Sequence, residues 1–545
     1  MQRHLFGRIA GLSIGLAPWV LAPRLAHATN VLEFPDNGSE QMARGGAWAA
    51  RASDPLAAYF NPAGLAGQRT GLALQANISF GHTCFTRVKA ANDTTVEPFA
   101  GTYPRVCNDV SAFPNPQLAG VYRINDRVGI GLAILAPSAV GSGTWPAFVD
   151  TAPGTPAAAA QAAPQRYLLI EGSAFQLNPT LGIGVEIIDN LRLGAGLTWG
   201  IFRAKLNNAA TVQNQERGVP SVNDLAATVI FSDYFVPGFN LGGIYTIGDS
   251  LDIAGTFKWS DSIKASGDAY TQANYFTQKV HDGDHSGIVD GDSSLSDCNN
   301  GAKSAGVCSP GMAHLKLPQP MEAKLAFRYH KPRAGVLQSH SRDPINTDVF
   351  DAEVDFTWAN NSAIDVMQIR FPGDAQGNGI IPIPGTPGTA PPNADIPRHY
   401  KDVFGVRVGG DYNVLPDELA LRGGAFFESN GQDVQYQNID FPGGARFGLA
   451  GGATYRLHVA KDRKSALEFH LGFMHVFYET QQNDDPNGNG IHAIAGTPCN
   501  PTESSLPAGD FCGSGRRKYQ TNFPVNLGTI TNAINVINVG ANYRF

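Results

Sequence analysis

The last twelve residues, INVINVGANYRF at 534–545, decide the fold class. Ile537, Val539, Ala541 and Tyr543 share one set of alternate positions, and small or polar residues fill the other. A period of two with one apolar face predicts a β-strand. A membrane barrel would turn that face to lipid and a soluble sandwich would bury it, so the alternation alone leaves both architectures open.

The same alternation recurs along the chain. It predicts about fourteen antiparallel strands, an even number within the range of outer-membrane barrels. The expected strands are 70–83, 115–124, 126–136, 171–187, 190–206, 236–247, 250–268, 312–330, 348–359, 400–413, 418–429, 446–458, 466–480 and 534–545.

The connections between strands favour the barrel over the sandwich. Tight turns around 187–192 and 244–253 alternate with long polar segments, which is the asymmetry of periplasmic turns and extracellular loops in outer-membrane proteins. Aromatic residues at strand ends, on the apolar parity, are expected to form interfacial girdles. Those aromatic residues are Trp199, Trp259, Trp358 and Tyr543. We therefore expect an all-β transmembrane β-barrel.

The first 28 residues have the pattern of an export signal. A basic start and an apolar middle lead to Ala26-His27-Ala28, a small-x-small cleavage pattern. A membrane anchor is the alternative, but Pro18 and Pro23 interrupt a short apolar run. The net charge of −7 does not show the excess of basic residues that would indicate a nucleic-acid-binding protein. We expect a multi-pass protein of a Gram-negative outer membrane.

The segment SDPLAAYFNPAGLAG at 53–67 lies between the signal and the first strand. Residues 29–68 are too few to bury a core of their own. Their small and polar composition would suit the polar interior of a barrel. The expected organisation is a signal peptide at 1–28, a plug (hatch) at 29–68 and a barrel at 69–545.

Several motifs together resemble the FadL-type outer-membrane transporters. They are Asn61-Pro62-Ala63 within the plug, DRVGIGLAILAP at 126–137, NPTLGIGVEIIDNLRLGAGLTWGI at 178–201 and the final Tyr543-Arg544-Phe545. The resemblance implies a monomeric importer of long-chain fatty acids or of aromatic or alkane hydrocarbons. It also implies capture by extracellular loops, binding in the barrel and lateral release into the outer-membrane lipid, with the plug as a gate.

The candidate for the lateral opening is the strand at 126–136. Gly129 and Gly131 weaken strand packing, and Pro137 cannot donate to a β-ladder. The alternative is that these glycines serve ordinary close packing in the barrel wall.

Charged residues on the polar face of the strands are balanced, seven basic against seven acidic. An unpaired arginine could anchor a carboxylate ligand, and Arg407 and Arg422 are the candidates. The alternative is an interior lined by mutually satisfied ion pairs. The residues are Arg192, Lys258, Lys324, Arg328, Arg407, Arg422 and Arg544, against Asp252, Glu322, Asp351, Glu353, Asp355, Asp411 and Glu468.

Six cysteines fall in three sequence neighbourhoods. In an exported chain this grouping favours three local disulfides, although other connectivities remain open. A metal site is disfavoured because no pair has the C-x₂-C spacing. The expected bonds are Cys84–Cys107, Cys298–Cys308 and Cys499–Cys512.

Three loop segments, DGDHSGI at 282–288, DAQGNGI at 374–380 and DPNGNGI at 485–491, have the start of a calcium-binding loop. All three lack its glutamate at position twelve, so metal-free Asx turns are the alternative. Weak calcium binding is the hypothesis, and we expect no other cofactor. Its ligands would include Asp282, Asp284, Asp374, Asp485 and Asn487.

Two other functions compete with the importer. A non-selective porin would need no plug. An outer-membrane hydrolase would need a nucleophile and a base, for which Ser465, Glu468 and His470 on one strand are the nearest arrangement. No oxyanion element accompanies them, so we expect a transporter rather than an enzyme.

Overall fold

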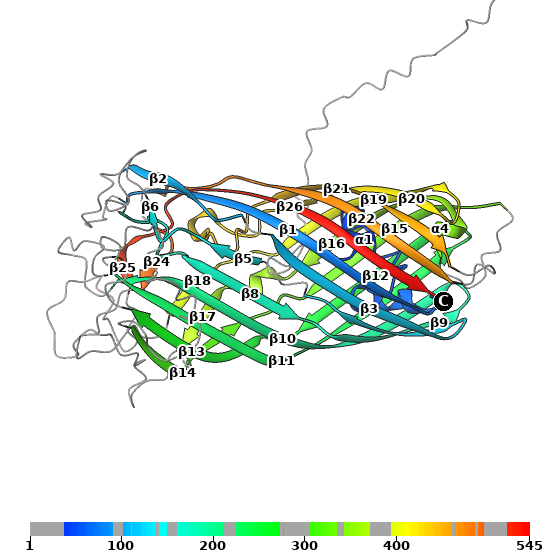
Figure 1. The fold of residues 1–545 in the computed structure, drawn as a ribbon, viewed down its shortest axis with the longest axis horizontal. Coiled ribbons are helices and arrows are strands. Elements are labelled where there is room, and N and C mark those ends of the chain that lie inside the picture. Colours follow the sequence, from blue (N-terminus) through cyan, green and yellow to red (C-terminus); the bar gives the residue numbers. More distant parts are fainter. Residues whose placement is uncertain are drawn as a thin grey trace, which may run out of the picture.

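The computed structural model shows a closed antiparallel barrel of fourteen strands (Figure 1). The structure describes residues 37–90, 102–110, 112–136, 141–149, 161–211, 224–272, 276, 306–334, 343–370, 394–459, 465–485, 489–494 and 520–545. Around the wall the strands are β1 (Gly71–Val88), β3 (Phe113–Asn125), β4 (Val128–Ile134), β9 (Thr180–Ile188), β10 (Leu191–Thr211), β11 (Asp224–Ile247), β12 (Leu251–Ser260), β15 (Glu322–Pro332), β16 (Asp348–Ala359), β19 (Val403–Leu415), β20 (Leu419–Glu428), β21 (Arg446–His458), β22 (Ala466–Tyr478) and β26 (Gly528–Arg544). Pairing of β26 with β1 closes the barrel.

Shorter strands extend the barrel or lie beyond it. The extensions are β2 (Thr102–Cys107), β5 (Gly141–Thr144), β8 (Glu171–Leu177), β13 (Ile263–Gln272), β14 (Gly306–Leu317), β17 (Val366–Arg370), β18 (Ala394–Pro397) and β23 (Gln481–Asn483). Two separate two-stranded sheets are β6 (Phe148–Val149) with β7 (Gln161–Ala162), and β24 (His492–Ile494) with β25 (Gln520–Pro524).

Proline divides two strands that the alternation had predicted as single. The predicted strand 171–187 is broken between β8 and β9 at Pro179, and the predicted strand 312–330 is broken between β14 and β15, where Pro318 and Pro320 lie. Proline has no N–H to donate to a ladder, so pairing lapses at these points.

The two ends of the barrel differ, as the sequence predicts. Short turns join β3 to β4, β9 to β10, β11 to β12 and β19 to β20, and the C-terminus lies at the same end, on the right in Figure 1. The strands β2, β6, β24 and β25 lie at the opposite end. Short turns are periplasmic in such barrels, so the opposite end is extracellular.

The two faces of the wall also have opposite character. Leu72, Leu197 and Leu471 point outward with exposed fractions of 57%, 71% and 62%. Charged side chains such as Arg192 and Asp252, on the other parity, are buried. An apolar exterior around a polar interior is the pattern of a membrane barrel.

Residues 37–68 lie against the inner faces of the strands, and we call them the inner segment. It contains the short helices α1 (Ser39–Ala43), α2 (Ala57–Phe60) and η1 (Pro62–Leu65), and almost all of its residues are buried. The first helix contacts β21 and β22, and the other two contact β4, β9 and β10. Other short helices are α4 (Pro344–Thr347), η6 (Asn361–Ala363) and η7 (Val434–Tyr436).

Among the described residues, no helix is both long and apolar enough to cross a membrane. The predicted signal at 1–28 lies outside the described residues.

Candidate functional site

The turn around Asn61 rests on glycines of the barrel wall. A methyl group added at Gly242 of β11 would lie 1.9 Å from Asn61 Oδ1, and one at Gly194 of β10 would lie 2.3 Å from the Ala63 nitrogen. Atoms cannot approach so closely, so these strands require glycine where the turn is seated. The Asn61 side chain accepts a hydrogen bond from the Ala63 N–H and donates one to the Ala49 carbonyl, which fixes the turn.

The glycines of the predicted lateral strand also lie against the inner segment. A methyl group at Gly129 of β4 would lie 2.2 Å from the Leu65 carbonyl oxygen, and one at Gly131 would lie 2.9 Å from Leu65 Cδ2. Both positions face the inner segment, so close packing accounts for these glycines. Pro137 lies outside the described residues.

A gap in strand pairing nevertheless lies next to β4. The ladder between β3 and β4 ends at the pair Leu118–Ile134. Within the described part of the chain, residues 113–117 of β3 pair only with β1, and β5 pairs only with β8. The Asn115 side chain donates a hydrogen bond to the Ala136 carbonyl across this interval, at 2.8 Å. We call the interval the wall gap.

Two arginines attach the inner segment to the opposite wall. Arg44 Nη1 lies 2.6 Å from carboxylate oxygens of both Asp351 and Asp411, and its Nη2 lies 3.0 Å from Glu353. Arg51 also bonds to Asp351 and Asp411. All five side chains are buried, so each charge depends on its partners for stabilisation.

The two arginines predicted as ligand anchors bond to carboxylates. Arg407 Nη2 lies 2.7 Å from Glu428, and Arg422 Nη2 lies 3.1 Å from Asp411. Both guanidinium groups are buried. These contacts are those of the ion-paired interior, and a ligand role for either arginine stays a prediction.

A pocket of about 280 Å³ lies where α2 faces β12 and β15. One of its lysines, Lys258, lies 3.2 Å from Glu322 and donates to the Tyr59 hydroxyl at 3.2 Å. The other, Lys324, lies 6.0 Å from the centre of the Phe60 ring. The pocket is lined by Tyr59, Phe60, Thr256, Phe257, Lys258, Glu322 and Lys324.

The sequence placed Lys324 among the basic residues of the polar face, but not among the predicted ligand anchors. Within the described chain no carboxylate lies within 4 Å of its ammonium group, and its charge acts on Asp355 only at longer range. The sequence placed Lys324 on the polar face but could not show that Glu322, two residues away, would pair with Lys258 on the neighbouring strand.

A larger cavity, of about 750 Å³ and partly open to solvent, lies nearer the extracellular end. Its polar edge is formed by Arg398, which bonds to both oxygens of Asp440. Most of its lining is apolar and includes Leu169, Leu206, Val229, Met367, Ile369 and Ile396.

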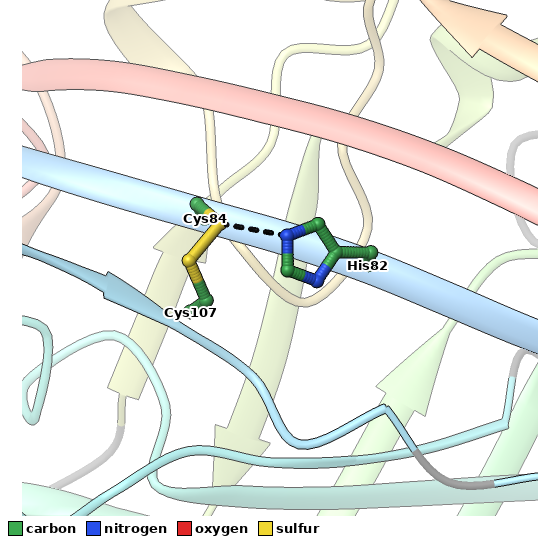
Figure 2. Close-up of side chains that lie close together, drawn as sticks. All are labelled: His82, Cys84 and Cys107. Carbon is green, nitrogen blue, oxygen red and sulfur yellow. Dashed lines mark hydrogen bonds between the residues drawn. A yellow bond between two sulfur atoms is a disulfide. The ribbon is translucent and has the colours of Figure 1, made fainter.

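Cys84 and Cys107 form a disulfide between β1 and β2, with an S–S distance of 2.00 Å (Figure 2). The His82 ring lies beside it, with Nε2 3.3 Å from Cys84 Sγ. Sulfurs in a disulfide are not thiolate ligands, so this group is not a metal site in its oxidised form. Cys298, Cys499 and Cys512 lie outside the described residues, and for Cys308 only its place in β14 is described.

Of the predicted calcium ligands, only Asp485 lies among the described residues. Its carboxylate accepts hydrogen bonds from Gln435 at 3.0 Å and from Asn489 at 2.9 Å. Asp282, Asp284, Asp374 and Asn487 lie outside the described residues, so calcium binding stays a prediction.

The residues of the hydrolase alternative bond mainly to residues outside it, and His470 Nε2 lies 4.0 Å from Glu468. Glu468 bonds to Arg456 at 2.6 Å and to Arg544 at 3.0 Å. His470 Nδ1 lies 2.7 Å from the hydroxyl oxygen of Thr454. Ser465 precedes β22, and within the described chain it forms no hydrogen bond with His470.

A scan against protein-family models matches residues 24–336 to the family described as outer membrane protein transport protein (OMPP1/FadL/TodX). The chain belongs to this family. The fold and the family make it an outer-membrane transporter of hydrophobic ligands in a Gram-negative bacterium. Among curated proteins, none matches the sequence.

Solved FadL-type structures share the fold. A Pseudomonas aeruginosa FadL homologue is 17% identical with a TM-score of 0.61, and the match covers 94% of this chain and 99% of that chain. The Ralstonia pickettii toluene transporter TbuX is 14% identical, with a TM-score of 0.54 and coverages of 95% and 99%. The P. putida toluene transporter TodX is 13% identical, with a TM-score of 0.51 and coverages of 93% and 98%.

Proposed function

We propose that this FadL-family protein imports long-chain fatty acids, with Lys324 as the contact for the carboxylate. The observation that carries the proposal is a lumen-facing ammonium group without a carboxylate within 4 Å, beside the aromatic rings of the inner segment. A carboxylate gains a charge-assisted hydrogen bond there, and the other described cations of the site already bond to acidic residues.

The proposed route has three steps. The apolar cavity near the extracellular end takes the ligand first, since its lining favours a hydrocarbon chain. The pocket at Lys324 holds the carboxylate next. The ligand then leaves sideways through the wall gap, because each methylene that enters lipid rather than water contributes about 0.8 kcal/mol.

The inner segment is proposed to act as the plug of this barrel. Its turn at Asn61 is seated on β10 and β11, and Leu65 packs on β4, next to the wall gap. A shift of this turn would therefore change the space beside the gap, whereas the buried ion pairs of Arg44 and Arg51 retain the rest of the segment.

A neutral hydrocarbon is the second candidate ligand. Among the described residues that line the apolar cavity, Arg398 carries the one guanidinium group, and this group bonds to Asp440. The cavity therefore offers no free cation to an anionic ligand. The toluene transporters among the similar structures have the same fold.

Uptake of labelled oleate and of labelled toluene by cells that produce the protein separates the two. With oleate as the ligand, Lys324→Met should weaken binding by roughly tenfold or more, since a hydrogen bond to a charged group contributes about 1.5–3 kcal/mol. Lys324→Arg should retain most binding, and the surface variant Lys401→Met should change nothing. Equal oleate binding by Lys324→Met and the parent would contradict the proposal, and uptake of toluene alone would favour the second candidate.

Conductance in planar bilayers tests the porin alternative. With the inner segment seated across the lumen, we expect no steady large conductance. A large and persistent conductance of the parent protein would contradict an importer.

A further inference from the structure

A group of aromatic residues marks the outer limit of the lipid-facing wall on β10 and β11. Trp199, Tyr234 and Phe235 all point outward and are exposed, and Tyr234 has an exposed fraction of 72%. The Trp199 and Phe235 rings lie edge to face at 4.9 Å, and the Trp199 indole donates to the Tyr234 carbonyl at 2.7 Å. Exposed aromatic residues of this kind lie where hydrocarbon meets the headgroups.

Beyond these rings the strands continue outward and present a line of polar residues. The register aligns Arg203 of β10 with Ser232 of β11, Ser266 of β13 and His314 of β14. Lys316 of β14 lies on the same face as His314, two residues along the strand, and pairs with Lys264 of β13. Arg203, His314 and Lys316 are exposed. We call Arg203, Ser232, Ser266, His314 and Lys316 the basic row.

The dimensions of the basic row suit a lipid headgroup with more than one phosphate. With about 4.8 Å between neighbouring strands, Arg203 and His314 are roughly 14 Å apart across the sheet. Arg203 follows Trp199 by four residues, which on a strand tilted by about 40° is roughly 10 Å further from the membrane centre. The headgroup region of an ordinary bilayer occupies about 5–8 Å beyond the hydrocarbon, so the row lies just beyond its outer edge, at the height of a headgroup larger than that of a phospholipid.

No acidic side chain of the described chain forms an ion pair with Arg203 or Lys316, although the Asp233 carboxylate lies nearby and accepts a hydrogen bond from the Lys264 N–H at 2.8 Å. Nearby Lys205 pairs with Glu171 at 2.8 Å, and Lys264 pairs with Asp261 at 2.7 Å. Within the described chain, neither Arg203 nor Lys316 has a carboxylate within 4 Å. Asp268 lies on the same face one row further out, opposite Ile230, and so beyond the phosphate level.

We propose that the basic row binds a phosphorylated glycolipid of the outer leaflet. Arg203 and Lys316 donate to phosphate oxygens, the Ser232 and Ser266 hydroxyls add donors between them, and the acyl chains lie along Trp199 and Phe235. The strands that carry this surface, β10, β11, β13 and β14, lie together along one side of the barrel (Figure 1).

The test measures binding of lipid A with two phosphates to the purified full-length protein in an uncharged detergent, with dephosphorylated lipid A in parallel. Replacing Arg203→Ser and Lys316→Ser together should weaken binding of the phosphorylated lipid by roughly thirtyfold, since each basic residue near a lipid surface contributes a factor of about five. Binding of the dephosphorylated lipid should be weak and unchanged.

Two control variants make the result specific. Arg105→Ser with Lys401→Ser removes two exposed basic residues elsewhere on the extracellular side and should leave binding intact. Arg203→Lys with Lys316→Arg should retain binding, which excludes a folding defect as the cause. Equal binding by the serine variant, an equal loss in the control, or equal affinity for the dephosphorylated lipid would overturn the proposal.

Discussion

Arg44 shows at the scale of one residue how the inner segment is attached. Its guanidinium group is buried and bonds to three carboxylates of β16 and β19. The sequence predicted the acidic residues on the polar faces of these strands but not their partner, because Arg44 comes from a segment more than three hundred residues away in the chain.

Removing that charge should destabilise the protein. The variant Arg44→Met removes the buried positive charge that faces the carboxylates of Asp351, Glu353 and Asp411. The free energy of unfolding should therefore fall by about 3–5 kcal/mol. Urea titration of the barrel in lipid vesicles measures it. Lys401→Met breaks an exposed pair with Asp433 and should cost about 1 kcal/mol or less. Similar losses in the two variants would contradict a stabilising role for the buried pairs.

Asp54 gives the inner segment a dependence on pH. Burial raises the pKa of its carboxyl from 3.8 to about 7, and the neighbouring Glu40 adds to the rise, while Gln75 and Arg544 oppose it. A raised pKa means that the folded protein favours the protonated form of the carboxyl group. The stability associated with that proton is complete below about pH 4 and is lost as the pH rises through 7.

Asp54→Asn should remove this dependence, since the amide does not titrate. We expect the free energy of unfolding of the parent protein to fall, relative to that of the variant, between pH 4 and pH 7. Urea titrations at several pH values measure the difference. A difference that stays constant over this range would show that Asp54 is ionised in the folded protein.

At the scale of elements, the glycines of β4, β9, β10 and β11 determine where the inner segment can rest. We expect Gly194→Ala to displace the turn at Ala63, because a methyl group there would lie 2.3 Å from a backbone atom, and to cost about 1–3 kcal/mol of folding free energy. Gly81→Ala is the matched control, since no atom lies within 4 Å of its added methyl group.

Limited proteolysis of the two variants shows whether the inner segment keeps its position in the barrel. Faster cleavage within residues 37–68 is expected for Gly194→Ala only. Equal cleavage rates in the two glycine variants would show that the glycine is not needed to seat the turn.

The strands could be predicted only where one face meets lipid. Alternation revealed β1, β10, β12 and β26 because their outward residues are apolar and their inward residues polar. The first half of β11 was expected to be a loop. There Ala226 and Thr228 on one face are as buried as Phe231 on the other, so the sequence does not alternate. The wall gap could not be predicted either, because it depends on where the pairing of β3 and β4 ends.

In the whole molecule, the proposed capture cavity, the pocket at Lys324 and the proposed side exit belong to one barrel. The barrel and the family could be predicted from the sequence, because strand periodicity and motifs are local features. The distance of Lys324 from any described carboxylate, on which its proposed ligand role rests, could not be predicted, because it depends on which neighbours β12 and β16 bring to it.

The proposed route depends on exit of the ligand through the wall gap, and a reversible cross-link across that gap tests it. Asn115→Cys with Ala136→Cys places two thiols across the gap, and Tyr122→Cys with Ile130→Cys places two across strands that are already paired. The measurement is uptake of labelled oleate, before and after oxidation of each pair. We predict that oxidation of the gap pair reduces uptake to the level of cells without the protein, that reductant restores it, and that the control pair has no effect. Uptake at the parent rate with the gap pair fully cross-linked would contradict the lateral exit.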